Sequence, residues 1–213
     1  MTTTSIVLLA CLAGTVANAG QPQRKVTVYL LGKANDRHMA CIPAQTLAGR
    51  MFAAIGISLE WAKGKAVAKP SQSPIIIEMV TRTPPKLMPG SLGYAVTCEG
   101  SHITVFLDRI EEMRAPSNVL AHVMVHEITH LLQGIGRHSA TGVMKEMWTA
   151  GDFGGMRLRP LSFTSVDIDL IYAGLRQSRR PKLPANGENE DPPCLRGVTA
   201  GAPEEAHLAG PVR

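Results

Sequence analysis

The sequence predicts an α+β domain, because segments with the period of a strand and segments with the period of a helix share one chain. Hydrophobic and polar residues alternate in 25–31 and again in 57–61, as in half-buried strands. Apolar residues recur at helical spacing in 43–55 and in 117–132. Once the two ends of the chain are set aside, about 155 residues remain, a length that suits one hydrophobic core.

The first helix is expected to begin near Pro43, which fits a first helical turn, and to end at Gly56, which fits a C-terminal cap. The apolar, β-branched run 75–77 predicts a buried strand. Prolines and glycines in 83–93 predict a loop. Two strands that form a hairpin are expected after this loop, at 94–97 and 102–107.

Two helices are expected in the second half of the chain. Ser117 offers an N-cap for a helix that runs to about Leu132. Thr164 or Ser165 can cap a last helix. The face of this last helix that packs on the core is expected to carry Val166, Leu170 and Ala173.

The N-terminus has the features of an export signal. An apolar run over 6–16 precedes Ala17-Asn18-Ala19, a small-x-small pattern, so we expect a signal peptide over 1–19 with cleavage after Ala19. A lipidated Cys11 is the alternative. The run is too short to span a bilayer and no later stretch is apolar enough, so we expect a secreted or periplasmic protein without stable membrane insertion.

Pro, Gly and charged residues dominate from Gln177 onward, which predicts a disordered tail over 177–213 and leaves one domain over 20–176. The formal charge of +5 is spread over scattered Lys and Arg residues, so no nucleic-acid partner is expected. The oligomeric state stays open.

Export would place three cysteines, Cys41, Cys98 and Cys194, where disulfides persist. One expectation pairs Cys41 with Cys98 and leaves Cys194 free, and the other leaves all three thiols unpaired.

The strongest chemical signal is His126-Glu127-Ile128-Thr129-His130, an H-E-x-x-H motif inside a predicted helix. Spacing of four residues puts both imidazoles on one face, one turn apart, so both can bind one zinc ion. Glu127 then lies beside the open coordination position, as a general base requires. The alternative is a chance pentapeptide with ordinary core histidines.

His122 lies one turn before His126 and competes for the role of ligand. The axial separation of His122 and His130 is about 12 Å, too far to share one zinc with bonds of about 2.1 Å. Glu127 favours the pair His126 and His130, because the base follows the first histidine of the motif. We therefore expect His122 to pack near the site rather than to bind metal.

A catalytic zinc takes a third protein ligand, and His138 is the expected one. Gly134 and Gly136 would let the chain leave the helix and turn back toward the metal. Glu146 is the rival, because a downstream glutamate is the third ligand in another large class of H-E-x-x-H enzymes.

The stretch HEITHLLQGIGRHSATGVM, from His126 to Met144, resembles the metzincin metallopeptidases, whose pattern is H-E-x-x-H-x-x-G-x-x-H followed by a methionine turn. The resemblance implies His126, His130 and His138 as zinc ligands, Glu127 as base, and Met144 as the turn methionine beneath the metal. Here the last histidine falls two residues late, so the loop that carries it must differ from the family pattern.

A closer resemblance is to signal-bearing bacterial proteins related to matrixin-like peptidases, with the pattern H-E-x-x-H-L-L-x-G-x-x-x-H-S followed by G-x-M and a tryptophan. His138-Ser139, Gly142-Val143-Met144 and Trp148 fit this pattern. It extends over most of 25–176 and implies a zincin-like, metzincin-type domain. Such a domain has a small twisted mixed sheet packed on a helix that precedes the active-site helix, and it ends in a C-terminal helix.

These observations predict a zinc-dependent peptidase that acts on peptide or protein substrates. An extended substrate would add to an edge strand, either 91–97 or 102–107. Two alternatives stay open: a secreted zinc-binding module without turnover, and a zinc hydrolase of a non-peptide amide or ester. A Glu127 in place argues against the first, because a structural zinc site needs no base.

Overall fold

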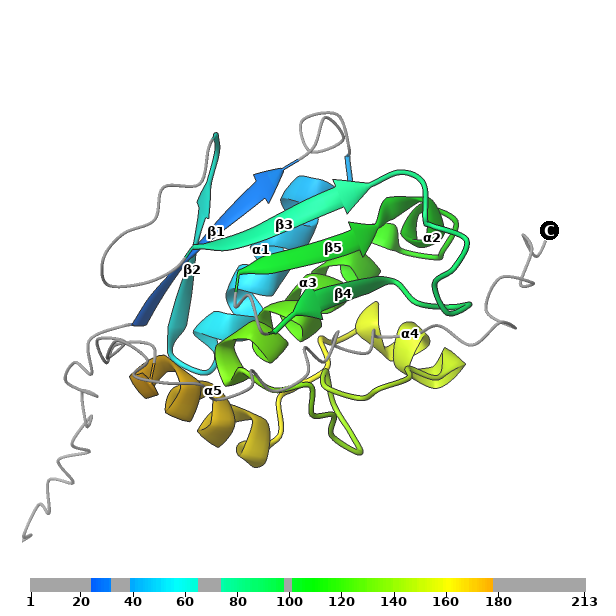
Figure 1. Cartoon of the computed structure of the whole chain (residues 1–213). Coiled ribbons are helices and arrows are strands. Elements are labelled where there is room, and N and C mark those ends of the chain that lie inside the picture. The colour runs from blue at the N-terminus through cyan, green and yellow to red at the C-terminus, as the bar shows by residue number, and fades with distance from the viewer. Residues whose placement is uncertain (1–23, 32–38, 65–73, 98–100, 178–213) are drawn as a thin grey trace, which may run out of the picture.

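The computed structural model describes residues 24–31, 39–64, 74–97 and 101–177, and Figure 1 shows the whole chain. The expected signal peptide, Cys98, Cys194 and all but the first residue of the expected tail lie outside the described residues. The elements in chain order are β1 (Arg24–Leu31), α1 (Cys41–Ala53), β2 (Ile57–Ala62), β3 (Ile75–Val80), β4 (Gly93–Val96), β5 (His102–Phe106), α2 (Leu107–Glu111), α3 (Pro116–Gln133), α4 (Ala150–Met156) and α5 (Ser165–Gln177).

The strands form a mixed five-stranded sheet in the order β2-β1-β3-β5-β4. The first four of these strands run parallel, and β4 is antiparallel to β5, with Gly93 opposite Val105 and Val96 opposite His102. The α+β class and each expected strand are confirmed. The order also puts β4 at an edge and β5 between two neighbours, which the sequence did not reveal.

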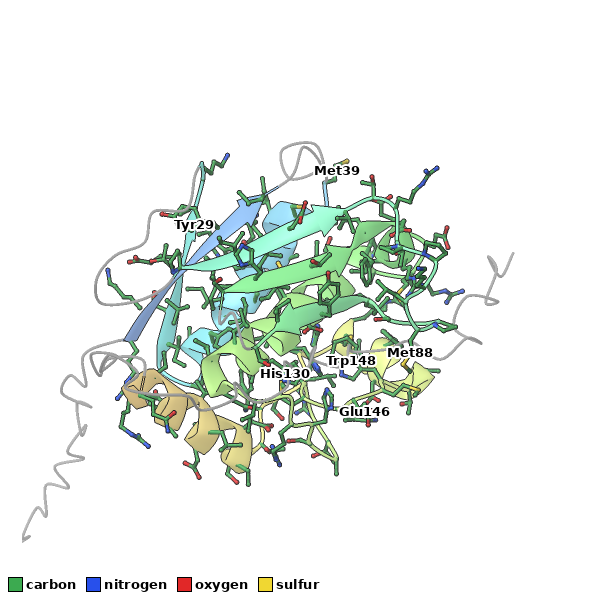
Figure 2. The ribbon with its side chains drawn as sticks, viewed as in Figure 1. Tyr29, Met39, Met88, His130, Glu146 and Trp148 are labelled. Carbon is green, nitrogen blue, oxygen red and sulfur yellow. The ribbon has the colours of Figure 1, made fainter. Side chains whose placement is uncertain are left out.

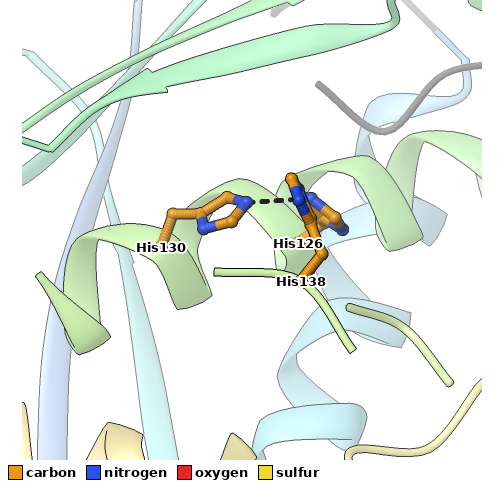
Figure 3. Close-up of side chains that lie close together, drawn as sticks. All are labelled: His126, His130 and His138. Carbon is orange, nitrogen blue, oxygen red and sulfur yellow. Dashed lines mark hydrogen bonds between the residues drawn. The ribbon is translucent and has the colours of Figure 1, made fainter. Parts of the chain in front are cut away.

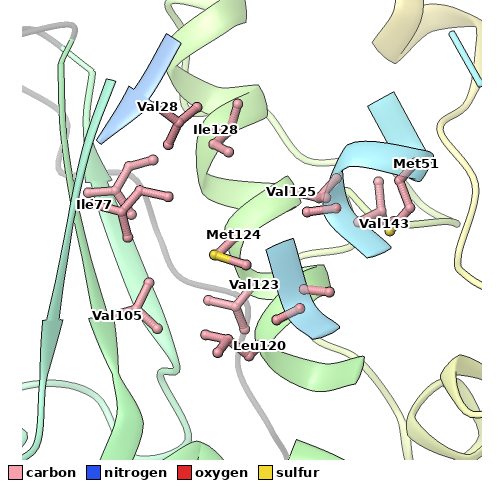
Figure 4. Close-up of a cluster of buried hydrophobic side chains, with 14 of the residues drawn as sticks. Val28, Met51, Ile77, Val105, Leu120, Val123, Met124, Val125, Ile128 and Val143 are labelled. Atoms are coloured by element: carbon pink, nitrogen blue, oxygen red, sulfur yellow. The ribbon is translucent and has the colours of Figure 1, made fainter. Parts of the chain in front are cut away.

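Helix α3 forms the centre of the fold: α1 and α5 pack on it, and its apolar stripe faces the sheet (Figures 1 and 4). The stripe of Leu120, Met124 and Ile128 is fully buried. Strands β1, β3 and β5 contribute Val28, Ile77 and Val105 to the same core (Figure 4). This burial fixes the rotation of α3, so its histidines must lie on the side away from the sheet.

The start of α3 differs from the expectation. The helix begins at Pro116, and the preceding Ala115 has left-handed backbone angles, with φ 56°. The cap position makes no side-chain hydrogen bond, so Ser117 is not an N-cap. Proline explains the shift, because its fixed φ and missing N–H suit the first helical position.

The expected packing face of the last helix was also wrong. Val166 is exposed, whereas the buried positions are Asp167, Ile171, Gly174 and Leu175. Two of these buried positions carry Asp167 and Gly174 rather than apolar side chains, so the inner face of α5 does not show as an apolar repeat in the sequence. The expected cap is confirmed at Thr164, whose hydroxyl accepts a hydrogen bond from the Asp167 backbone at 3.2 Å.

Cys41 carries a free, buried thiol at the start of α1. The thiol donates to the Met79 sulfur at 3.7 Å, and burial raises its pKa. The expected pairing of Cys41 with Cys98 is therefore wrong, because Cys41 faces the core against β3. Within the described residues, no helix combines the length and apolar character that a membrane span needs.

Candidate metal centre

His126 and His130 lie one turn apart on α3, and both are fully buried. Their Nε2 atoms are 3.0 Å apart and face each other (Figure 3). The spacing of four residues on a helix produces this approach, as the sequence predicted.

The opposite ring nitrogens are held by backbone carbonyls. Nδ1 of His126 lies 2.9 Å from the Val143 oxygen, and Nδ1 of His130 lies 3.1 Å from the Ile135 oxygen. A carbonyl only accepts, so each Nδ1 carries the proton and each neutral ring has its lone pair on Nε2. Two lone pairs that face each other at this distance repel, and a cation between them removes the repulsion. The donor set therefore fits a metal ion.

His138 completes the cluster from a loop. Gly134 ends α3 with a left-handed φ of 70°, its N–H bonded to the His130 oxygen at 2.9 Å, and so reverses the chain. The His138 ring centroid lies 5.3 Å from that of His126 and 4.9 Å from that of His130 (Figure 3). One ligand atom from each histidine lies within 4.8 Å of the others, so the three can hold one metal ion. Gly136, unlike Gly134, has no positive φ.

A turn that follows His138, from Ser139 to Met144, packs against the histidine cluster. The Ser139 N–H donates to the Met144 oxygen at 2.8 Å, and the neighbouring Val143 oxygen orients His126. Met144 is fully buried in this turn, whereas Glu146 is exposed. The cluster of three contains His138 rather than Glu146, which Figure 2 labels. The geometry thus favours His138 over its rival.

Glu127 follows His126 on α3 and is fully buried. It lies beneath the start of the edge strand β4, because a methyl group added to Gly93 would lie 3.6 Å from Glu127 Cγ and 3.1 Å from a Val123 methyl. Glycine at this position therefore lets β4 pass close to the carboxylate-bearing face of α3. The Glu127 side chain therefore lies next to the edge of the sheet, at the start of β4.

His122 uses both ring nitrogens in structural hydrogen bonds. Its Nδ1 donates to the Asn118 oxygen at 2.7 Å, and its Nε2 accepts from the Leu161 N–H at 3.0 Å. No lone pair is left for a metal, which confirms that His122 packs near the site. The buried Trp148 ring lies edge-on to His122 and His126, with centroid distances of 6.2 and 5.8 Å, and so forms a wall of the cluster.

Burial sets the charge of the two helical ligands. It is the main cause that lowers the pKa of His126 well below the usual range, and the neighbouring His130 lowers it further. Burial likewise lowers the pKa of His130 to about 4. Both rings are therefore neutral near pH 7, which is the form that binds a metal.

Asp167 was missed in the sequence. It lies in the first turn of α5, far along the chain from the motif, yet its buried carboxylate accepts from Ser139 Oγ at 2.6 Å and from Arg137 at 3.1 Å. The pattern Thr164-x-x-Asp167 is the only local signal, and it points to a helix cap. Contact with the loop around His138 depends on tertiary structure.

Comparison with known proteins adds no assignment. No model of a known protein family matches the chain, and no curated protein is similar enough in sequence to be matched. What can be said of function therefore rests on the geometry of the described residues, in which three histidines could hold one metal ion.

Proposed function

We propose that this chain is a zinc-dependent peptidase with a zincin-like, metzincin-type domain. The observation that carries the proposal is the pair of buried Nε2 lone pairs of His126 and His130, which face each other beside Glu127. With bonds of about 2.1 Å, tetrahedral zinc places its ligand nitrogens about 3.4 Å apart, close to the separation seen here. His138 would be the third ligand, and three protein ligands leave a position for water or substrate.

A bound zinc ion would supply a Lewis acid that polarises the scissile carbonyl and lowers the pKa of the attacking water. Glu127 is the residue that would take the proton from this water and return it to the leaving amine. Its burial beneath β4 keeps bulk water away from the carboxylate. Trp148 closes the side of the site next to His126.

Peptide is the favoured substrate because of the edge strand. Of the two segments considered, 102–107 is excluded, because β5 is hydrogen-bonded on both sides, to β3 and to β4. Among the described residues, strand β4 pairs with β5 on one side only, and it starts at Gly93, against Glu127. An extended peptide that adds to β4 would bring its backbone amides to the base and the histidines. The proposal also includes export, with the mature protein beginning after Ala19.

The test measures zinc content and turnover of a quenched peptide library by residues 20–213. The Glu127→Gln variant should keep one zinc per chain and lose turnover by about 100-fold or more, because the general base is gone. Glu146→Gln is the matched control, since Glu146 is exposed. It should keep both the zinc content and the peptide turnover of the wild type. His138→Ala should bind zinc measurably but more weakly than the wild type.

Two outcomes would count against the proposal in different ways. A wild-type protein that takes up no zinc removes its basis. A zinc-loaded wild type that cleaves no peptide would favour one of the two alternative functions, a hydrolase of a non-peptide amide or ester or a zinc-binding module without turnover.

A further inference from the structure

We propose that Asp167 is a positioning residue that holds His138 in place for the metal ion. This inference rests on the metal site of the proposed function. Asp167 is 28 residues away from Ser139 in the sequence and belongs to α5, whereas the loop it touches follows α3.

One carboxylate oxygen of Asp167 contacts the chain on both sides of His138. Oδ1 accepts from Ser139 Oγ at 2.6 Å and from Arg137 Nη1 at 3.1 Å. The same Arg137 nitrogen donates to Ser139 Oγ at 3.2 Å, which closes a triangle around the backbone of the intervening residue. The charged acceptor makes these bonds stronger than bonds between neutral groups.

The other oxygen fixes the carboxylate to its own helix. Oδ2 accepts from the Thr164 N–H at 2.9 Å and from the Thr164 hydroxyl at 2.7 Å. The Asp167 carbonyl also accepts from the side chain of Gln133, at the end of α3, at 3.3 Å. Asp167 therefore joins three parts that meet at the metal site: the end of α3, the ligand loop and the start of α5.

His138 lies on a loop, whereas the other two histidines of the cluster lie on a helix. His126 and His130 lie on a buried helix, and a backbone carbonyl orients each ring. His138 lies in an irregular segment between Gly134 and the Met144 turn, and Asp167 contacts the residue on each side of it. A metal ligand must be held to within about 0.5 Å, and a loop reaches this precision only when its flanks are fixed.

A role in capping α5 alone would also account for the contacts of Asp167 with Thr164, and the two carboxylate oxygens allow the two roles to be separated. Ser139→Ala removes the shorter of the two contacts with the loop and leaves the cap. Thr164→Ala removes the hydroxyl from the cap and leaves both loop contacts. Positioning predicts weaker metal binding in Ser139→Ala and Asp167→Ala. Capping alone predicts a loss of stability without a change in metal affinity.

The experiment measures zinc affinity of the mature protein by competition with a chelator, and the visible spectrum of the cobalt-substituted protein. Asp167→Ala should bind zinc about 10- to 100-fold more weakly, as variants of residues that support metal ligands do, and its cobalt spectrum should approach that of His138→Ala. Thr164→Ala should keep the wild-type affinity and spectrum. If Asp167→Ala does not fold, Ser139→Ala gives the same comparison.

A double variant provides the decisive comparison. If Asp167 acts through His138, adding Asp167→Ala to His138→Ala should weaken zinc binding no further. Additive losses, or wild-type affinity in both Asp167→Ala and Ser139→Ala, would overturn the inference and leave the zinc peptidase proposal intact. Conversely, tight zinc binding that depends on Asp167, in a wild type that cleaves no peptide, would support the inference and contradict the proposed activity.

Discussion

The metal-free protein should begin to lose stability at a pH well above the range in which carboxylates titrate. The reason is that His126 and His130 are buried as neutral imidazoles, which lowers the pKa of each ring. The folded state resists protonation of these rings, whereas the unfolded chain takes up protons at the ordinary histidine pKa. Stability that is present above about pH 6.5 is therefore lost progressively as the pH falls toward the folded-state pKa.

The size of the effect follows from His130, whose pKa falls from 6.5 to about 4 on folding. Between these two values the free energy of unfolding should decrease by about 1.4 kcal/mol per pH unit. At about pH 4.5, the protonation of His130 alone should have lowered the free energy of unfolding by about 2.5 kcal/mol relative to neutral pH. His126 is shifted in the same direction and adds to the loss. Natural domains have about 5–15 kcal/mol of stability, so the effect is large enough to measure.

The assay is urea unfolding in the presence of a chelator at a series of pH values, followed by tryptophan fluorescence. His130→Gln should reduce the pH slope by about 1.4 kcal/mol per unit. Gly154→Ala, which changes no titratable group and has open space around the new methyl, is the control, and it should keep the wild-type slope. An unfolding free energy of the chelated wild type that stays constant from about pH 6.5 to 4.5 would refute the reasoning.

Two further predictions concern the packing around α3. Gly174→Ala should reduce stability by about 1–3 kcal/mol, because the new methyl group would overlap the Leu132 carbonyl oxygen and push α5 away from α3. Gly154→Ala in α4 has open space around the new methyl and serves as its control; equal urea midpoints for the two variants would contradict the close approach. His122→Leu should cost about 1–3 kcal/mol, because it leaves the partly buried Leu161 N–H without its acceptor and removes the ring's hydrogen bond to the Asn118 oxygen. Its zinc content should match the wild type, and a loss of metal without a loss of stability would mean that His122 is a ligand.

Much of the fold could be predicted from the sequence because its signals are local. The strands alternate over a few residues, and the apolar stripe of α3 continues through the H-E-x-x-H motif. The approach of His126 to His130 follows from helix geometry alone. Gly134 in the sequence indicated the chain reversal that brings His138 back toward His126 and His130. A helix ends in this way at a residue that tolerates a positive φ.

Features that depend on tertiary contacts could not be predicted. The order of strands in the sheet decides that β4, and not β5, has a free edge, and no local pattern records that order. The inner face of α5 carries Asp167 and Gly174, which sequence periodicity counts as outward-facing. The pairing of Cys41 failed for the same reason, since spacing along a chain does not show which way a thiol points.

The carbonyls of Val143 and Ile135 have a consequence for how the protein matures. They orient two of the three rings of the cluster through contacts within the chain itself. Small zinc domains whose ligands assemble around the ion behave in the opposite way and unfold without it. Under the proposed function, the ion would enter a site whose two helical rings are already oriented, so metal uptake would follow folding rather than drive it.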